Sequence, residues 1–326
     1  MKHSPIIAAI LALATAAPAF AETNWTMASG YPESSFFTKN IRQFIDAVET
    51  RTNGELKIDL RSNDSLIKLD GIKRAVQSGQ IQIGEVRLSA YGNEAEIFNL
   101  DNIPGIAANF DQAWTMMEVQ KPYFDEMFAK NGMQIISYTA WPGQGFYTDA
   151  PIESLADLDG VKLRIYSQQT QKLGKGLGAE AIILPFAEVP QAFATNMIQA
   201  LWTSAQTGTD VQAWDYVDTF TYTGTMHQKN AILVNQRAMR ALPDDIRAIV
   251  VEEGEKATAR GWEMAKAAGD ERVAVLRENG MTIADAPEDV MTRISEIGDE
   301  LTQEWLAKAT DAEKAVYNSY KAALQK

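Results

Sequence analysis

Arg164 is the residue whose type and position most clearly indicate binding chemistry in this chain of 326 residues. Residues 161–166 alternate apolar and polar side chains, the pattern of a half-buried strand, and Arg164 lies near the end of it. Short helices and further strands follow, and in parallel sheets of this kind ligands bind beyond the carboxyl ends of the strands. A guanidinium there can hold a carboxylate through two parallel hydrogen bonds. Arg164 is therefore a candidate carboxylate anchor; the alternative is a surface arginine on the polar face of its strand.

Three further candidates come from turns and strand ends. Tyr31 stands at the first predicted strand-to-helix turn and Arg87 at the end of the third predicted strand, both on the edge where a ligand would be met. The alternatives are an aromatic ring packed on its helix and a solvated arginine. Trp141 opens the segment 141–145, whose proline and glycines predict a fixed, exposed turn and the crossing into a second domain. Its indole either lines the cleft or fills the space at the hinge between the domains.

Catalytic and metal-binding chemistry lacks the residues that it needs. The chain contains no cysteine, which excludes disulfides, thiolate catalysis and cysteine-type metal sites. His227 is the only histidine outside the first residues, and neither a G-x-S-x-G elbow nor a G-x-x-x-x-G-K-S/T phosphate loop occurs. We therefore predict no enzymatic activity, no metal and no cofactor. An exported enzyme, such as a carboxylate-using glycosidase, is the alternative from another class, although no acid pair stands out.

Charge and composition restrict the partners. The formal net charge is −13, which argues against nucleic acid because phosphate binding depends on clustered Lys and Arg. An anionic ligand would have to be attracted locally, by one or two arginines inside a cleft. Hydrophobic residues make up 46% of the chain, enough for two domains with their own cores.

The N-terminal residues predict export. Lys2 and His3 form a short positive region, residues 6–17 are apolar, and Ala19-Phe20-Ala21 is a small-x-small cleavage site. We predict a signal peptide over residues 1–21, cleaved after Ala21, and a periplasmic location. The apolar run is too short for a lasting transmembrane helix, and no later stretch is long enough.

The predicted elements that would position these residues are those of an α/β protein. Residues 24–88 predict a β-α-β-α-β arrangement, and residues 157–208 predict three strands alternating with two helices. A single helix is predicted over residues 243–278, about 54 Å long at roughly 1.5 Å per residue. Such a helix is too long for one small domain.

Several motifs in this order resemble those of the substrate-binding proteins of TRAP transporters, the tripartite ATP-independent periplasmic carriers of organic acids, of the dicarboxylate-binding-protein (DctP) type. They are TAWPGQGFYTDAPI, DLDGVKLR, GAEAIILPFAEVPQAF and MHQKNAILVN, and the likeness covers nearly the whole chain. In that family the arginine that ends the D-L-x-G-x-K-x-R motif grips the substrate carboxylate, and it matches Arg164. The resemblance implies a two-domain periplasmic binding protein fold with a central cleft and a long helix that braces both domains.

Two departures from the family pattern bear on the ligand. Gln144 occupies a position where many members have an arginine, and residues 199–204 replace a D-G-x-E-N-P motif. Thr203 or Ser204 would take over the lost polar role, and Trp202 places an indole there. The complete set of candidate ligand-binding residues is Arg164, Trp141, Trp202, Thr203, Ser204, Tyr31, Arg87, Tyr166 and Gln144.

The expected function follows from the resemblance. We expect a periplasmic solute-binding protein that captures an organic acid through an arginine–carboxylate pair and delivers it to TRAP membrane subunits, with no ATPase. With Gln144 in place of the arginine of many members, the site has one cation fewer than theirs, and Trp141 and Trp202 offer flat apolar walls. We therefore expect an aromatic or other apolar monocarboxylate. The alternatives are a small dicarboxylate, with Arg87 as second cation, a keto or hydroxy acid, and a binding protein of an ATP-driven transporter.

The predicted domains follow from two crossings of the chain, near Trp141 and near Asn230. Domain I comprises residues 22–141 with about 230–265, and domain II comprises residues 142–229 with about 266–326, including the C-terminal helices. We expect a monomer.

Overall fold

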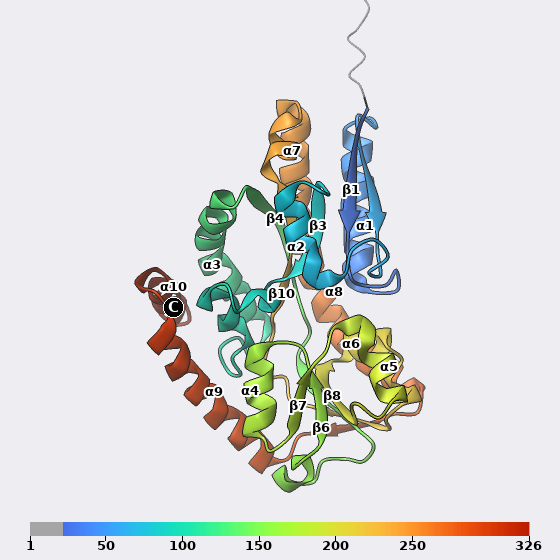
Figure 1. The fold of residues 1–326 in the computed structure, drawn as a ribbon, viewed down its shortest axis with the longest axis vertical. Helices are drawn as coiled ribbons and strands as arrows, with labels where there is room; N and C mark the ends of the chain where they lie inside the picture. The colour runs from blue at the N-terminus through green and yellow to red at the C-terminus, as the bar shows by residue number, and fades with distance from the viewer. Residues whose placement is uncertain (1–21, 326) are drawn as a thin grey trace, which may run out of the picture.

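The computed structural model describes residues 22–325, so the predicted signal peptide lies outside the described residues. Two β-sheets follow each other along the long axis of the molecule, and helices cover them (Figure 1). The first sheet has the order β2-β1-β3-β10-β4 and the second the order β11-β9-β5-β8-β6-β7. The α/β fold with two sheet-centred halves agrees with the predicted fold class.

The strands of the first sheet are β1 (Thr23–Ala28), β2 (Leu56–Arg61), β3 (Ile83–Arg87), β4 (Met133–Ala140) and β10 (Lys229–Asn235). The strands of the second sheet are β5 (Gln144–Thr148), β6 (Lys162–Ile165), β7 (Glu180–Ile183), β8 (Ala200–Ser204), β9 (Thr219–Tyr222) and β11 (Thr282–Asp285). In the first sheet β2, β1 and β3 are parallel, and β10 runs antiparallel to β3 and β4. In the second sheet β8, β6 and β7 are parallel, so their carboxyl ends meet at one edge.

The α-helices are α1 (Phe36–Arg51), α2 (Leu69–Ser78), α3 (Phe110–Lys130), α4 (Gln168–Gly176), α5 (Val189–Ala194), α6 (Ala205–Asp210), α7 (Gln236–Ala241), α8 (Asp244–Glu278), α9 (Glu288–Lys308) and α10 (Asp311–Ala323). Short 3-10 helices span Leu88–Tyr91, Glu96–Asn102, Leu155–Leu158, Phe186–Glu188 and Ala213–Asp215. Within residues 22–325, no helix has the length and apolar character needed to cross a membrane.

Helix α8 is packed against both halves of the molecule. Ile246 and Val250, near its start, lie in a core cluster with strands of the first sheet, whereas Leu276, near its end, packs with Phe220 of the second. Its 35 residues correspond to the predicted long helix, which begins one residue later than predicted because Pro243 is its N-cap. At Gly254 the helix approaches β4 so closely that a Cβ would lie 2.4 Å from the Ile136 carbonyl oxygen. The predicted bracing helix is therefore present.

Two antiparallel segments carry the chain between the sheets, and they bond to each other. Residues 141–143 join β4 to β5, and residues 223–228 join β9 to β10. The Trp141 N–H donates to the Gln228 carbonyl oxygen over 2.8 Å, and the Gly224 N–H donates to the Gln144 carbonyl oxygen over 3.0 Å. We call these two paired connections the crossing segments.

The predicted exposed turn at residues 141–145 is wrong. All five residues are buried, and the last two belong to β5. Proline and glycine do interrupt the strand there, but the segment lies between the two sheets and pairs with residues 223–228, so neighbours cover it.

The C-terminal helices return from the second half of the molecule to the first (Figure 1). Helix α9 contacts α4 and the 3-10 helix Glu96–Asn102, and α10 packs on α3. The predicted division into two domains, which assigned these helices to domain II, stays a prediction.

Candidate ligand-binding site

A narrow cavity lies beside the crossing segments, between the two sheets. A water-sized sphere has only about 10 Å³ of room in it, and its walls are formed by Tyr31, Arg87, Trp141, Gln144, Arg164, Tyr166, Phe186, Thr203, Thr207 and Gln228. Arg87 comes from the first sheet, Arg164 and Thr203 from the second, and Trp141 from the crossing segments. A molecule held in this cavity would contact both halves of the protein.

Arg164 lies on β6 and is only 1% exposed. The predicted half-buried strand is wrong here, because both faces of β6 are covered, one by the hydrophobic core and one by the cavity residues, and its residues from Leu163 onward are all buried. The Arg164 Nε donates to the Leu184 carbonyl oxygen over 3.1 Å. Burial, and next the positive charge of Arg87, lower the pKa of Arg164 to about 9, so the side chain is still cationic at neutral pH.

Arg87, on β3 of the first sheet, lines the same cavity as Arg164. It is 8% exposed, and its Nη2 donates to the Tyr166 carbonyl oxygen over 3.0 Å. The Tyr166 ring lies 5.2 Å from the Arg87 guanidinium carbon and 5.6 Å from that of Arg164. Within residues 22–325 neither arginine forms an ion pair with a carboxylate, and the negative charge of Asp70 acts on Arg164 less strongly than Arg87 does.

Two buried cations without a carboxylate are electrostatically unfavourable. Removing a charge from water costs several kcal/mol unless an opposite charge compensates for it. An anion bound in the cavity would supply that charge and could accept hydrogen bonds from both guanidinium groups. The arrangement is therefore suited to a small acid.

The remaining polar groups of the cavity are neutral. The Gln144 side chain is held internally, because its Nε2 donates to the Pro142 carbonyl oxygen over 2.8 Å and its Oε1 accepts from the Tyr166 hydroxyl over 3.2 Å. Gln228 accepts the Ser89 hydroxyl hydrogen at its Oε1 over 2.7 Å, which leaves its amide hydrogens for other acceptors. Amide and hydroxyl groups of this kind can recognise an uncharged polar end of a ligand.

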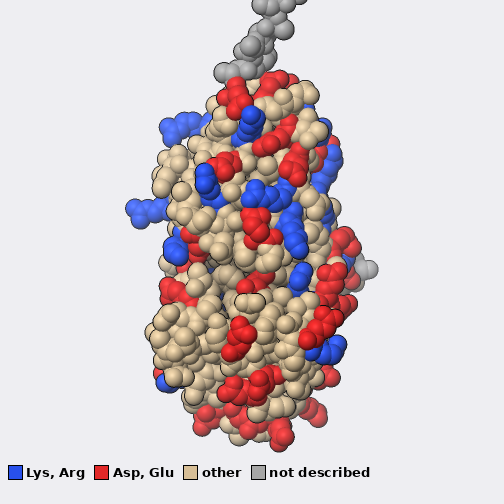
Figure 2. Space-filling model, turned by 90° about the vertical axis from the view of Figure 1, so that its right-hand side faces the viewer, with Lys and Arg blue, Asp and Glu red and all other residues tan. Residues whose placement is uncertain are grey.

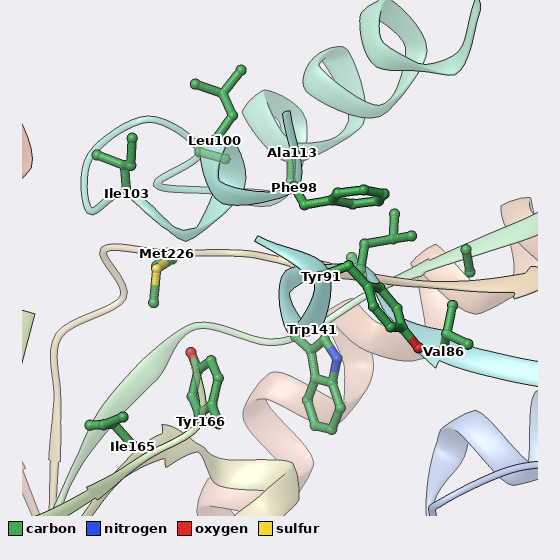
Figure 3. Packing of buried hydrophobic residues seen from close by; sticks show 14 of the residues in the cluster. Val86, Tyr91, Phe98, Leu100, Ile103, Ala113, Trp141, Ile165, Tyr166 and Met226 are labelled. Carbon is green, nitrogen blue, oxygen red and sulfur yellow. The ribbon is translucent and has the colours of Figure 1, made fainter. Parts of the chain in front are cut away.

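Aromatic rings form the apolar wall. The rings of Tyr31 and Trp141 meet edge to face with centroids 5.3 Å apart, and Phe186 meets Tyr31 at 5.8 Å. The Trp141 indole is fixed by a 2.8 Å hydrogen bond from Nε1 to the Asn230 Oδ1. Figure 3 shows Trp141 on its crossing segment and Tyr166 just after β6, below the packed residues around Phe98.

Seven of the nine predicted ligand-binding residues line this cavity, and Trp202 and Ser204 do not. Trp202 lies next to Thr203 on β8, and because neighbouring side chains of a strand point to opposite faces it packs against Phe146, with ring centroids 4.6 Å apart. Ser204 uses its hydroxyl to accept the Thr207 N–H at the start of α6.

Phe186, Thr207 and Gln228 line the cavity but were not predicted. Phe186 follows β7 and Thr207 follows β8, so both lie at the same carboxyl edge as the end of β6. The rule that selected Arg164 could have found them. Gln228 stands in the quoted motif MHQKNAILVN, but nothing in the sequence distinguishes it from its polar neighbours.

Charges of both signs cover the face of the molecule shown in Figure 2. Asp and Glu dominate its lower end, and Lys and Arg lie mostly over its upper half. Inside the cavity, the two arginines are the charged groups that could attract an anion. In the part of the chain that the structure describes, no cluster of three or more His, Cys, Asp or Glu side chains could hold a metal ion.

Comparison with known proteins gives consistent matches over most of the chain. The model of the family described as bacterial extracellular solute-binding protein, family 7 (DctP), matches residues 27–309. The crystal structure of DctP7, a Bordetella pertussis extracytoplasmic solute receptor binding pyroglutamic acid, has a TM-score of 0.90 and 36% identity, over 92% of this chain and 99% of that one. The crystal structure of DctP6 from the same organism, also a receptor binding pyroglutamic acid, has a TM-score of 0.89 and 33% identity, over 92% of this chain and 100% of that one.

A curated relative points to the same class of protein. The C4-dicarboxylate-binding periplasmic protein DctP of Rhodobacter capsulatus is 25% identical over 295 residues, 84% of each chain.

Proposed function

Because this chain belongs to the DctP family of bacterial extracellular solute-binding proteins, family 7, and is thus a solute-binding component of a TRAP transporter, we propose that it binds a small cyclic monocarboxylate of the pyroglutamate type. The ligand carboxylate lies between Arg164 and Arg87, and the ring lies against Tyr31, Trp141 and Phe186. The observation that carries this proposal is the pair of buried arginines in a cavity that contains no carboxylate.

A single carboxylate satisfies both arginines. It has two oxygens and about four acceptor positions, enough for one guanidinium on each side. The cavity also offers the neutral side chains of Thr203 and Gln228, which favour an uncharged carbonyl or amide on the ligand. A lactam ring that bears one carboxylate has both features.

Similarity to known receptors favours a small ring over a larger aromatic acid. The cavity itself gives a water-sized sphere only about 10 Å³, so its walls must move apart to admit any acid. Two receptors that are 33% and 36% identical to this chain bind pyroglutamic acid. We therefore narrow the sequence-based expectation of an apolar or aromatic monocarboxylate to a compact cyclic acid.

A small dicarboxylate remains the second candidate for a specific reason. The two arginines come from different sheets, so each could hold one carboxylate of a short diacid. The two candidates differ in what the neutral groups would contact, because the diacid would leave Gln228 without a role in binding.

The proposal includes export and delivery. The protein is cleaved after Ala21, is secreted to the periplasm and passes its ligand to the TRAP membrane subunits as a monomer that does not itself catalyse a reaction. N-terminal sequencing of the periplasmic form, and recovery of the acid unchanged after incubation, test these parts.

The binding test uses residues 22–326, unfolded and refolded to remove any acid that co-purifies. Melting temperatures are measured with pyroglutamate, proline, succinate, malate and phenylacetate. We expect pyroglutamate to raise the melting temperature, because a ligand at 100 times its dissociation constant stabilises the fold by roughly 2.7 kcal/mol. Proline is the matched control: it keeps the ring and the carboxylate but adds a positive charge that the two arginines disfavour. A response to succinate and not to pyroglutamate would replace the first candidate by the second.

A further inference from the structure

Glu85 is a buried carboxylate behind the ligand cavity that has no cationic partner in residues 22–325. It lies on β3, two residues before Arg87, and is 2% exposed. Its Oε2 accepts the Ser29 hydroxyl hydrogen over 2.6 Å, and its Oε1 accepts from the Asn230 Nδ2 over 2.9 Å. Glu85 does not itself line the cavity.

Both hydrogen bonds of Glu85 lead to the aromatic wall of the cavity. Asn230 donates to Glu85 and accepts from the Trp141 indole N–H over 2.8 Å, so its amide orientation is determined from both sides. Ser29 donates to Glu85 and accepts from the Tyr31 backbone N–H over 3.3 Å. The Glu85 carboxyl group is therefore bonded to the two residues that hold Tyr31 and Trp141, whose ring centroids are 5.3 Å apart.

We propose that Glu85 is a positioning residue that holds Tyr31 and Trp141 in place and that takes up a proton when an anionic ligand binds. The inference rests on the proposed binding of a carboxylate between the two arginines. A bound anion places a negative charge near Glu85, and like charges disfavour the ionised form of a carboxyl group.

The surroundings of Glu85 support a proton uptake near neutral pH. Burial raises the pKa of the Glu85 carboxyl to about 7, and the hydrogen bonds from Ser29 and Asn230 oppose this rise only in part. The charged or titratable groups around the network are Tyr31 after β1, Asp64 after β2 and Arg87 on β3.

From β10, Glu85 faces the neutral side chain of Asn230, whose other partner is the neutral indole of Trp141. Lys229, the neighbour of Asn230 on β10, is already paired with Asp101 over 2.6 Å. No basic side chain from these elements is therefore available to keep Glu85 ionised.

Two variants separate the positioning role from the protonation. Glu85→Gln keeps an oxygen acceptor and cannot ionise, whereas Glu85→Leu removes both hydrogen bonds. For the wild type, we expect pyroglutamate affinity to rise about two- to fivefold from about pH 8 to about pH 6, the factor for a ligand-induced rise of the Glu85 pKa by about half to one unit from about 7. Titration calorimetry in two buffers of different ionisation enthalpy should show proton uptake.

The Glu85→Gln variant should bind pyroglutamate with no proton uptake and no pH dependence. The Glu85→Leu variant should bind it at least tenfold more weakly than wild type at every pH.

A measurement without ligand keeps this test separate from the identity of the ligand. Folding raises the pKa of the Glu85 carboxyl from 4.5 to about 7. The protonated carboxyl therefore stabilises the fold fully below about pH 4.5, and this stabilisation is lost as the pH rises through about 7. The melting temperature of wild type relative to Glu85→Gln should therefore fall between about pH 5 and about pH 8.

Two outcomes would overturn the proposal. A Glu85→Gln variant with the pH dependence of wild type, in stability or in binding, would exclude Glu85 as the titrating group. A Glu85→Leu variant that folds and binds like wild type would exclude the positioning role. If no acid binds to wild type while the ligand-free pH dependence is as expected, the proposed ligand is wrong and the titration of Glu85 stands.

Discussion

Arg87 and Arg164 belong to different sheets and lie against the same ring, that of Tyr166, at 5.2 and 5.6 Å from its centroid. Both are buried, and the positive charge of one lowers the pKa of the other. Two such groups repel each other, and an anion between them would compensate for the repulsion. Because each half of the protein supplies one cation, an anion bound as we propose would join the two halves.

Replacing Arg164 by Met should remove the main carboxylate anchor while filling most of its space. We expect a loss of about 3 to 5 kcal/mol of binding free energy, two to three decades or more in affinity, because the ligand carboxylate would stay buried without its partner. Calorimetry measures the affinity. Ligand-free stability should be unchanged or higher, since a buried charge without an acidic partner is removed. Arg74→Met, an exposed arginine on α2, is the matched control. An Arg164→Met protein that binds within threefold of wild type would refute the role.

Arg87 and Arg164 should act on the same carboxylate. In a double-mutant cycle with Arg87→Met, Arg164→Met and the double variant, we expect the two losses of pyroglutamate binding energy to be non-additive by about 1 kcal/mol or more, as found for residues that share a partner. Fully additive losses would indicate that each arginine holds a different end of the ligand, as a dicarboxylate requires.

The sequence predicted the family and the two-domain fold, and both are confirmed. The long helix was predictable because Pro243 and the Asn279-Gly280 pair mark its ends. Strand β5 was not predicted, because Pro142 and Gly143 resemble a turn and only distant partners, β8 and β9, make the following residues a strand.

The site was predictable where a residue lies at a strand end and not where packing decides. Arg164 and Arg87 follow from the rule for strand ends, and they meet in the cavity. The burial of Arg164 depends on residues from distant segments, such as Arg87, Trp141 and Phe186, that cover its face of β6. Trp202 and Thr203 could not be separated before the orientation of β8 was known.

His227 should make the fold sensitive to acid. Burial lowers the pKa of its imidazole from 6.5 to about 4, and its Nδ1 lies 3.1 Å from the Trp141 carbonyl oxygen in the crossing segments. Because the unfolded chain binds the proton more readily, stability should fall as pH falls from about 6.5 to about 4, by up to about 3 kcal/mol. Urea unfolding at several pH values measures this. His227→Asn, which keeps a hydrogen-bond donor, should be less stable at pH 7 but should lose less on acidification; an equal loss would assign the acid sensitivity to another group.

Ligand binding should close the two halves around the cavity. Residues from both sheets line it, and the sheets are connected by the crossing segments and by α8. Small-angle scattering should show a smaller radius of gyration with saturating pyroglutamate than without it. Arg164→Met at the same ligand concentration is the control and should give the ligand-free curve. Superposable wild-type curves in the two conditions would count against closure.

The most direct test of the account is a calorimetric titration of refolded, ligand-free protein with pyroglutamate and, separately, with succinate. The account predicts saturable binding of pyroglutamate at a single site with a dissociation constant in the micromolar range or below, much weaker binding of succinate, and loss of the pyroglutamate signal in Arg164→Met. Tight succinate binding with no pyroglutamate signal, or pyroglutamate binding that Arg164→Met leaves intact, would contradict a monocarboxylate held by the two buried arginines.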